Sequence, residues 1–423
     1  MFDLAYIKEH ADLIAENAKN RRKNVAIPKL LQTYDVYLAL LREKEALQAE
    51  RNTLAQTIGR EKDARGRDVL LQQGKKLRGE IDAREEELTR IKNEKIDPLR
   101  AVIPNLTHPD APIGESEQDN RVLRAHGDVP EFSFVPKDHV ELMEALDLID
   151  FERGTKVAGA KAYFLKNEAV LLEFALERFA LDMLREAGFT LLTTPDFAKD
   201  EIVAGAGFSP RGPETQVYSL EGDAKSLIGT AEIAMCGYHQ NEIFAEHELP
   251  RKYAAFSHCF RTEAGAYGRE SKGLYRVHQF SKVEMFAYTT PETSEAMHQE
   301  LIGMEEKIFS ALGLPYRVVD LCTADLSTVA YRTFDVEAWM PGRGIWGEIS
   351  STSNTTTFQA SRLGIKVERA DGKKEYAHML NGTAMTNSRI IIALVENYQQ
   401  EDGSIAIPKP LHPYMGMQKI EKK

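Results

Sequence analysis

The sequence predicts an α+β protein in which an antiparallel β-sheet flanked by helices follows an N-terminal antiparallel α-helical coiled-coil arm. Three observations support this fold class. Apolar residues recur at three-, four- and seven-residue intervals between Pro28 and Pro98, with no proline in between. Prolines then gather in residues 98–130. From residue 131 onward, helical patterns mix with short β-rich runs without strict alternation, which favours an antiparallel or mixed sheet over a parallel one.

The composition is that of an ordinary globular protein. The 423 residues are 43% hydrophobic and 28% charged. No window of eighteen uninterrupted apolar residues occurs, so we expect no membrane-spanning helix. The three cysteines show no CxxC pairing, so neither a disulfide framework nor a structural zinc site is expected. The net charge of −11 argues mildly against a protein that coats nucleic acid indiscriminately. The acidic N-terminus is unlike a signal peptide, and we expect a cytoplasmic protein without a membrane partner.

The N-terminal region is expected to be helical throughout. Residues 3–18 predict one short amphipathic helix, and the coiled-coil arm follows at about residues 28–98. The break KDARGRD, with Gly66, predicts a turn between two helices of about 30 residues, each roughly 45 Å long. The predicted seam positions are Val36, Leu40, Leu47, Leu54 and Ile58 in the first helix, and Leu70, Leu77, Ile81, Leu88 and Ile91 in the second.

The outer part of the arm, residues 60–78, is locally basic in an acidic chain. This segment contains seven Lys or Arg residues and three acidic residues, which gives a local net charge of +4. A solvated charged tip and a surface for the phosphate backbone of RNA both fit this composition. The seven basic residues are Arg60, Lys62, Arg65, Arg67, Lys75, Lys76 and Arg78.

The proline-bearing stretch 98–130 has the composition of a linker. We therefore expect two domains, an N-terminal domain at 1–110 that contains the arm and a second, larger domain at 111–423. In the second domain, AGAGF at 204–208 lacks the spacing of a dinucleotide-binding loop and is expected to be a loop, and no GxxxxGK[ST] segment occurs.

The segment FRTEAGAYGRESKGLYRVHQF, residues 260–280, has the pattern of a strand, a glycine-bearing loop and a returning strand. Arg261 and Glu263 share one strand face by parity, as do Arg276 and Phe280. Two guanidinium groups, a carboxylate and an aromatic ring on one sheet face suit a nucleoside triphosphate. Taken alone, the same pattern fits a surface hairpin with incidental salt bridges.

Other polar groups stand in patterns that suit ligand binding. Thr230 and Glu232 lie two apart on an expected strand, and Glu284 is a carboxylate among apolar neighbours that would need a partner. Glu348 stands among hydroxyl side chains, the oxygen ligands that Mg²⁺ prefers. Arg389 is expected at the start of a helix, where phosphate is favoured. Pro195 marks the end or bend of an edge strand.

These segments together resemble the seryl-tRNA synthetases, a family of class II aminoacyl-tRNA synthetases. FRTEAG and GLYRVHQFSKVEMF are similar to motif 2, GFTLLTTPDF to motif 1, and LNGTAMTNSR to motif 3. The resemblance implies a class II synthetase-like sheet. It implies an ATP site made of Arg261, Thr262, Glu263, Arg276, Val277, Phe280, Glu348, Ile349, Ser350, Ser351 and Arg389. It implies a serine site made of Thr230, Ala231, Glu232, Arg261, Glu284, Asn381 and Thr383.

The resemblance also implies the reaction and the partners. Serine would be activated with Mg²⁺-bound ATP to seryl-adenylate and transferred to tRNA(Ser), and also to tRNA(Sec), with Arg261, Glu348 and Arg389 as catalytic residues. Glu348 and Ser351 would hold the metal ion, the arm would grip the tRNA, and Pro195 would lie at a homodimer interface. Two alternatives stay open, namely a non-catalytic tRNA-binding relative and an amino-acid:carrier-protein ligase.

The chain departs from the common bacterial pattern at a few positions. Ala384 and Ser388 stand where glycines are usual, and Ala266, Tyr267 and Lys272 also differ. These changes leave the arginines and carboxylates named above in place.

Overall fold

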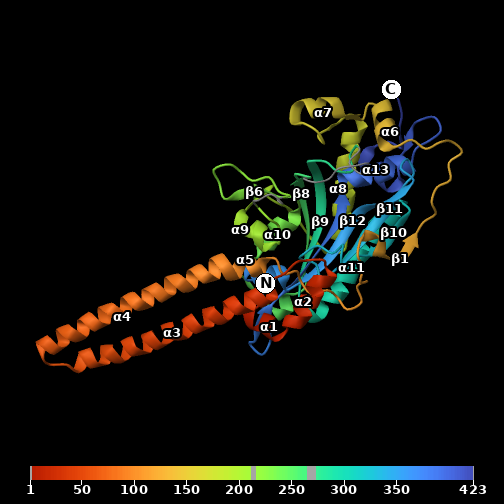
Figure 1. Cartoon of the computed structure of the whole chain (residues 1–423). Helices are drawn as coiled ribbons and strands as arrows, with labels where there is room; N and C mark the ends of the chain where they lie inside the picture. Colours follow the sequence, from red (N-terminus) through yellow and green to blue (C-terminus); the bar gives the residue numbers. More distant parts are fainter. Residues whose placement is uncertain (1, 211–215, 264–272, 423) are drawn as a thin grey trace. The chain divides into compact units, whose positions relative to one another are not determined.

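A computed structural model describes residues 2–210, 216–263 and 273–422. The chain divides into two compact units, Met1–Pro104 and Asn105–Lys423 (Figure 1). None of the helices in these described residues is both long enough and apolar enough to cross a membrane. The predicted motif 2 loop, with Ala266, Tyr267 and Lys272, lies outside the described residues for the most part.

The first unit is entirely helical. Its helices are α1 (Leu4–Glu9), α2 (Ala11–Asn20), α3 (Ile27–Arg60), α4 (Ala64–Ile91), the π-helical turn η1 (Lys92–Ile96) and α5 (Asp97–Ala101). The single helix expected at 3–18 is wrong, since the chain breaks at His10 into two short helices. The break between the long helices covers only residues 61–63. Gly66 lies within α4, where the Asp63 side chain accepts a hydrogen bond from its amide at 2.8 Å and caps the helix.

The long helices α3 and α4 form the expected antiparallel pair. Leu77, Ile81, Leu88 and Ile91 are buried on α4, whereas Val36 is half-exposed and is not a seam residue. Arg84 of α4 donates to Glu43 of α3 at 3.0 Å. At the base of the pair, the two short helices pack on α3, α4 and η1 around a cluster of isoleucines and a leucine: Ile7, Ile14, Ile27, Leu30, Ile91, Ile96 and Ile103.

The second unit is built on an eight-stranded sheet with the order β1-β10-β11-β12-β15-β9-β8-β4. The strands are β1 (Arg121–His126), β10 (Tyr316–Asp320), β11 (Arg332–Met340), β12 (Ile345–Thr356), β15 (His378–Thr386), β9 (Gln279–Thr289), β8 (Arg251–Phe260) and β4 (Thr190–Thr193). Every neighbouring pair is antiparallel except β4 and β8, which are parallel. The predicted sheet is therefore confirmed, with one parallel edge strand.

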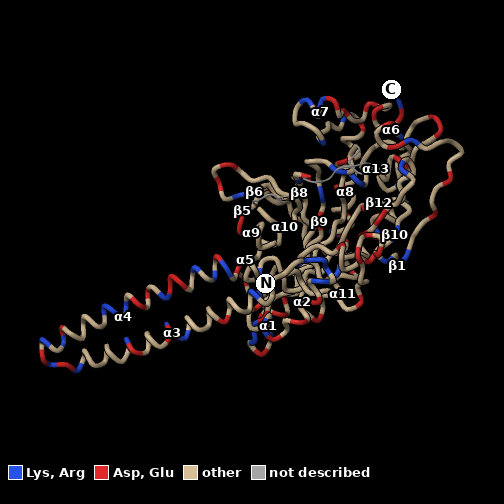
Figure 2. The backbone as a smooth tube through the Cα atoms, in the orientation of Figure 1, with Lys and Arg blue, Asp and Glu red and all other residues tan. Residues whose placement is uncertain are grey.

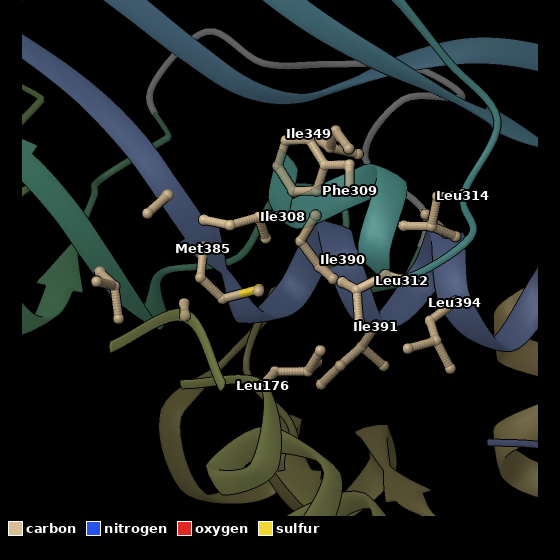
Figure 3. Close-up of a cluster of buried hydrophobic side chains, with 14 of the residues drawn as sticks. Leu176, Ile308, Phe309, Leu312, Leu314, Ile349, Met385, Ile390, Ile391 and Leu394 are labelled. Atoms are coloured by element: carbon tan, nitrogen blue, oxygen red, sulfur yellow. The ribbon is translucent and has the colours of Figure 1, made fainter. Parts of the chain in front are cut away.

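Helices cover both faces of this sheet. On one face, α8 (Glu168–Glu186), α11 (Ser294–Ala311) and α13 (Asn387–Asn397) enclose the main hydrophobic cluster (Figure 3). On the other, α9 (Asp200–Gly205), α10 (Ala231–Tyr238) and α12 (Phe358–Leu363) enclose a second cluster. Strand β9 alternates between them, because Val283 and Met285 join the first cluster and Phe286 and Tyr288 the second.

Shorter elements connect these layers. The expected loop at 204–208 is wrong in part, because Ala204 and Gly205 end α9. The remaining elements include α6 (His139–Ala145), α7 (Phe151–Ala158), α14 (His412–Met415), β2 (Ile149–Asp150), β3 (Phe164–Leu165), β5 (Phe197–Lys199), β6 (Lys225–Leu227), β7 (Ile243–Ala245), β13 (Lys366–Glu368), β14 (Lys374–Tyr376), β16 (Ile405–Ala406) and β17 (Lys419–Ile420).

Candidate active site

A polar cavity lies where β8, β9, β12 and β15 meet the beginning of α13. Most of the residues expected to bind a nucleotide line it: Arg261, Glu263, Arg276, Val277, Phe280, Glu348, Ile349, Ser350 and Arg389. Thr383, expected to bind an amino acid, lines the same cavity. Segments that are far apart in the sequence therefore converge on one site.

Arg261 and Phe280 come together as predicted, but by a different route. β8 ends at Phe260 and β9 begins at Gln279, so Arg261, Glu263 and Arg276 all lie outside the strands. Glu263 has a φ of +48°, a left-handed conformation that is incompatible with a continuing strand. The expectation of shared strand faces is wrong for these three residues. The Arg261 guanidinium nevertheless lies 5.3 Å from the centre of the Phe280 ring.

Two of the arginines that line the cavity, Arg276 and Arg389, are each paired with a carboxylate of the same site. Arg276 Nη1 lies 3.6 Å from Glu263 Oε2, and Arg389 Nη1 lies 2.7 Å from Glu348 Oε1. Arg261 donates from Nε to the Gly229 carbonyl at 3.2 Å. A bound polyanion would have to exchange these partners for its own oxygens.

Arg389 stands in the first turn of α13, as the sequence predicted. Its guanidinium lies 4.8 Å from the ring centre of Tyr275, and the guanidinium of Arg343 lies 4.6 Å from the same ring. Sequence reasoning missed Tyr275. Its position directly before Arg276 was the available signal.

A β-bulge in β12 determines which side chains face the cavity. The register shifts between Val336 and Glu337, so Ile349 has no partner on β11 and Glu348 and Ser351 face the same side. Ile349 is buried in the hydrophobic cluster (Figure 3), and the Ser350 hydroxyl donates to the Thr383 carbonyl at 2.5 Å. These two residues can therefore offer only their main chain to a nucleotide.

Glu348 and Ser351 border an adjoining cavity of about 740 Å³ together with Asp335. Asp335 pairs with Ser351 in the register of β11 and β12. Burial, and then the negative charge of Glu348, raise the pKa of Asp335 well above its ordinary value, although a hydrogen bond from Ser351 opposes the shift. This donor set consists of oxygens, which suits Mg²⁺ that keeps some of its water. Within the described chain, no cluster of three His, Cys, Asp or Glu forms a complete metal site.

A second, buried group of polar side chains surrounds Glu232. Thr230 caps α10 by accepting from the Glu232 amide at 3.2 Å, so the expected strand at this place is wrong and Glu232 lies in a helix. Glu232 Oε1 accepts from Gln359 Nε2 at 2.7 Å and from Asn381 Nδ2 at 3.0 Å. Burial, and then the charge of Glu284, raise the pKa of Glu232 to about 7. Ala231 is fully buried beside it, and Gln359 was not predicted.

Glu284 has the buried position that the sequence predicted, at 2% exposure. It forms an ion pair with Lys282, which is also buried, and accepts from Thr383 Oγ1 at 3.3 Å. Sequence reasoning missed Lys282. It stands two residues before Glu284 on β9 and so shares its sheet face.

Comparisons with known proteins agree with this geometry. Residues 1–107 match the family described as the seryl-tRNA synthetase N-terminal domain, and residues 216–398 match the tRNA synthetase class II core domain (G, H, P, S and T). The serine–tRNA ligase of Rubrobacter xylanophilus is 53% identical over 420 residues, which cover 99% of each chain. That of Treponema denticola is 51% identical over 99% of this chain and 100% of its own.

The chain belongs to the seryl-tRNA synthetase family. Among solved structures, the seryl-tRNA synthetase from Pyrococcus horikoshii complexed with ATP matches with a TM-score of 0.91 at 38% identity over 100% of both chains. The cytoplasmic serine–tRNA ligase from Naegleria fowleri in complex with AMP matches with a TM-score of 0.83 at 31% identity, over 97% of this chain and 96% of its own.

The basic residues of the arm lie in the helical pair of this seryl-tRNA synthetase family member. Arg60 ends α3, Lys62 is in the turn, and Arg65, Arg67, Lys75, Lys76 and Arg78 are on α4 (Figure 2). All seven are exposed. Lys76 and Arg78 make only long i,i+4 contacts, at 3.9 Å to Glu80 and 4.0 Å to Asp82, which leaves their charges facing solvent.

The remaining sequence-predicted positions have simple surroundings. Pro195 is exposed in the segment between β4 and β5. Ala384 and Ser388, which replace the usual family glycines, are both buried, at 0% and 4% exposure. Ala384 packs in the main hydrophobic cluster, whereas Ser388 lines the polar cavity.

Proposed function

We propose that this chain is a serine–tRNA ligase that joins L-serine to the 3′ end of tRNA(Ser) in two steps that together consume one ATP. In the first, the serine carboxylate attacks the α-phosphorus of ATP, which gives seryl-adenylate and pyrophosphate. In the second, a terminal ribose hydroxyl of the tRNA attacks the acyl carbonyl, the acyl–phosphate bond breaks, and AMP leaves. The observation that carries the proposal is the continuity of the two pockets, since Thr383 and Lys282 of the buried group line the same cavity as Arg261 and Arg389.

The first step needs alignment and charge stabilisation rather than a protein nucleophile. Arg261 would hold the serine carboxylate and the α-phosphate together. Arg276 and Arg389 would release Glu263 and Glu348 and take the outer phosphates. Glu263 would then be free to accept from the adenine amine, with the adenine ring on Phe280. Thr262 and Val277 would contribute through the main chain beside these groups.

Mg²⁺ fits the donor set of this nucleotide site. When bound, the ion neutralises charge on the phosphates of ATP. Glu348 and Ser351 would hold it, and substrate oxygens and water would complete its coordination. Separation of Glu348 from Arg389 would free both groups for the substrate. The carboxylate would become available to the metal ion and the guanidinium to phosphate.

The buried polar group would select serine. Glu232, with Thr230 and Ala231 beside it, would bind the ammonium group, and Glu284 and Thr383 would bind the hydroxyl. Asn381 holds Glu232 at 3.0 Å and so fixes this pocket. A site built to bond a hydroxyl group discriminates strongly against a ligand that lacks it, because its buried polar groups are then left unpaired.

The macromolecular partners are part of the same proposal. The exposed basic residues of α3 and α4 would bind the backbone of tRNA(Ser), and of tRNA(Sec) through the same surface. A homodimer would form through the edge of the sheet around Pro195, where Phe174, Leu191 and Phe197 are 60%, 37% and 49% exposed. The reaction belongs to the cytoplasm, where tRNA is charged for translation.

Pyrophosphate exchange with each of the twenty amino acids, without tRNA, tests the proposal. Serine alone should support exchange between pyrophosphate and ATP in the presence of Mg²⁺. Exchange with another amino acid would mean that the pocket around Glu284 selects a different side chain. Absence of exchange with all twenty would favour a non-catalytic tRNA-binding protein. Transfer of activated serine to a carrier protein but not to tRNA would favour a carrier-protein ligase.

A further inference from the structure

A buried histidine–glutamate pair lies outside the residues described so far. His139 begins α6 and Glu396 lies near the end of α13, with exposures of 1% and 0%. The His139 amide donates to Glu396 Oε1 at 2.9 Å, and His139 Nδ1 lies 3.1 Å from the same oxygen. Glu396 Oε2 accepts from the Gly342 amide at 3.0 Å, in the turn between β11 and β12. The carboxylate thus joins three segments.

The other imidazole nitrogen contacts the segment that leads into β9. The Leu274 amide donates to His139 Nε2 at 3.2 Å. The preceding Gly273 has a φ of +66°, and a Cβ atom there would lie only 2.1 Å from His139 Nε2. Only glycine permits this close approach with this backbone conformation. The main chain at Gly273 and Leu274 therefore rests directly on the edge of the imidazole ring.

These hydrogen bonds determine the tautomer of His139. A backbone N–H group can only donate, so Nε2 must be the accepting, unprotonated nitrogen. The proton of the neutral ring is then on Nδ1, which faces the Glu396 carboxylate. Glu396 therefore does more than fill space, because its charge selects the tautomer that can accept from Leu274.

The residues that follow Leu274 belong to the nucleotide site. The Tyr275 ring lies against both Arg389 and Arg343, and Arg276 pairs with Glu263 at 3.6 Å. Peptide geometry couples successive residues, so a shift of Leu274 displaces Tyr275 and Arg276. Displacements of about 1 Å in a phosphate-binding group are sufficient to reduce catalysis substantially.

We propose that His139 and Glu396 are positioning residues for ATP. Glu396 fixes the tautomer of His139, and His139 fixes the main chain at Leu274, which places Tyr275 and Arg276 against the outer phosphates. Among the described residues, the side chains of His139 and Glu396 make no hydrogen bond to a residue of the proposed serine pocket. The identity of the ligand rests on the proposed function, whereas the effect on the main chain does not.

Two substitutions of His139 separate its two contacts. His139→Gln keeps an accepting oxygen near the place of Nε2, and His139→Asn keeps a donor near the place of Nδ1 but does not reach Leu274. In pyrophosphate exchange, His139→Asn should raise the KM for ATP about tenfold, because the buried Leu274 amide loses its acceptor. The KM for serine should change less than about twofold, and His139→Gln should recover most of the affinity for ATP.

Glu396→Gln tests the tautomer with a nearly identical shape. Its single amide oxygen cannot accept from both His139 and Gly342, which the two carboxylate oxygens do. When the NH2 group faces His139 Nδ1, it favours the tautomer with the proton on Nε2, which cannot accept from Leu274. This variant should also raise the KM for ATP selectively. Equal increases of KM for ATP and serine, or equal defects in His139→Asn and His139→Gln, would overturn the proposal.

Gln399 provides a matched control in the same two segments. Its side chain accepts from the Lys137 amide at 2.8 Å and donates to the main-chain carbonyls of Lys137 at 3.1 Å and Glu396 at 2.8 Å. Among the described residues it makes no hydrogen bond to Leu274, Gly342 or the Glu396 carboxylate. Gln399→Ala should lower thermal stability without a selective rise in the KM for ATP. A rise as large as that of His139→Asn would show that general loosening, and not the Leu274 contact, is responsible.

Hydrogen–deuterium exchange gives a readout that does not depend on the activity. The peptide that contains Leu274 should exchange faster in His139→Asn than in the wild-type protein and in Gln399→Ala. Unchanged exchange would overturn the role of His139. If the wild-type protein showed no serine-dependent pyrophosphate exchange, the proposed function would fail while this measurement still decided whether the pair holds the main chain.

Discussion

Lys282 and Glu284 are 6% and 2% exposed, and each depends on the other for its charge to be tolerated. Removing one member of a buried ion pair leaves an uncompensated charge, which is far more costly than losing a surface pair. Glu232 lies in the same pocket but forms no direct ion pair among the described residues. Burial and the charge of Glu284 raise its pKa to about 7, against the smaller lowering effects of Lys282 and Arg261. The pocket thus holds one carboxylate that is neutralised by lysine and one that is poised to lose or gain a proton.

The pKa of Glu232 predicts how serine binding depends on pH. Below pH 7 this carboxyl group is mostly protonated and attracts an ammonium group weakly, and above pH 7 it is mostly ionised. The KM for serine should therefore fall about tenfold between pH 6 and pH 8, while the KM for ATP changes little. Glu232→Gln should abolish the pH dependence of serine binding. A flat profile in the wild-type protein would contradict the assignment of Glu232 to the ammonium group.

The ion pair predicts a large stability defect for a single substitution. Lys282→Met should lower the free energy of unfolding by about 3 kcal/mol, measured in denaturant, because Glu284 is left buried without its cation. The double variant Lys282→Met, Glu284→Gln should recover much of this loss. Lys225 offers a control, since the side chains of Lys225 and its partner Asp223 are 37% and 48% exposed and Lys225→Met should cost under about 1 kcal/mol. Equal losses in the two lysine variants would show that burial does not matter here.

At the scale of elements, periodicity predicted the structures that depend on local sequence. The helical hairpin was predictable because seam residues such as Leu77 and Ile81 recur along one chain segment. Thr230 and Glu232 were assigned to a strand because a spacing of two fits a strand face. The alternative signal was a threonine cap before the helix formers of AEIA. The bulge at Ile349 was not predictable, since it exists only in relation to β11.

The same limits apply to the site. The arginines and carboxylates could be named from motifs, but their pairing within the site could not, because it depends on side chains that meet from different elements. Lys282 could have been found from its parity with Glu284. His139 could not, because its partners Leu274 and Glu396 lie 135 and 257 residues away.

The N-terminal end of α13 predicts the effect of removing Arg389. Arg389→Ala should reduce the rate of pyrophosphate exchange by at least about a hundredfold, because a preorganised phosphate-binding cation is lost. Arg389→Lys should restore only part of the rate, since lysine cannot form the guanidinium fork. Unchanged adenylate formation in Arg389→Ala would contradict the role assigned to this helix start.

At the scale of the whole molecule, the two units divide the proposed work. The unit that ends at Pro104 carries the exposed basic residues, and the unit that begins at Asn105 carries the whole polar cavity. We therefore expect that activation of serine needs no side chain of the first unit, whereas charging of tRNA needs both units. The net charge of −11 makes the local basic surface of α3 and α4 more important, because the rest of the chain repels a polyanion.

This division predicts that the two activities can be separated by substitution. Changing Lys75, Lys76 and Arg78 together to Gln should raise the KM for tRNA at least about tenfold, because three phosphate-facing charges are lost. Pyrophosphate exchange should be unchanged. Replacement of Glu80, Asp82 and Asp68 by Gln is the matched control and should not weaken tRNA binding. Parallel loss of both activities would contradict a dedicated RNA-binding arm.

The candidate active site neutralises much of its own charge through three internal ion pairs. These are Arg276 with Glu263, Arg389 with Glu348, and Lys282 with Glu284. A substrate that binds there takes the place of a carboxylate as the partner of a cationic side chain. Few ions from solution therefore need to be displaced. Within the part of the chain that the structure describes, the seven basic residues of the arm have no such close internal partner, so dissolved anions screen their charges. Rising ionic strength should consequently weaken the capture of tRNA steeply and leave the activation of serine nearly untouched.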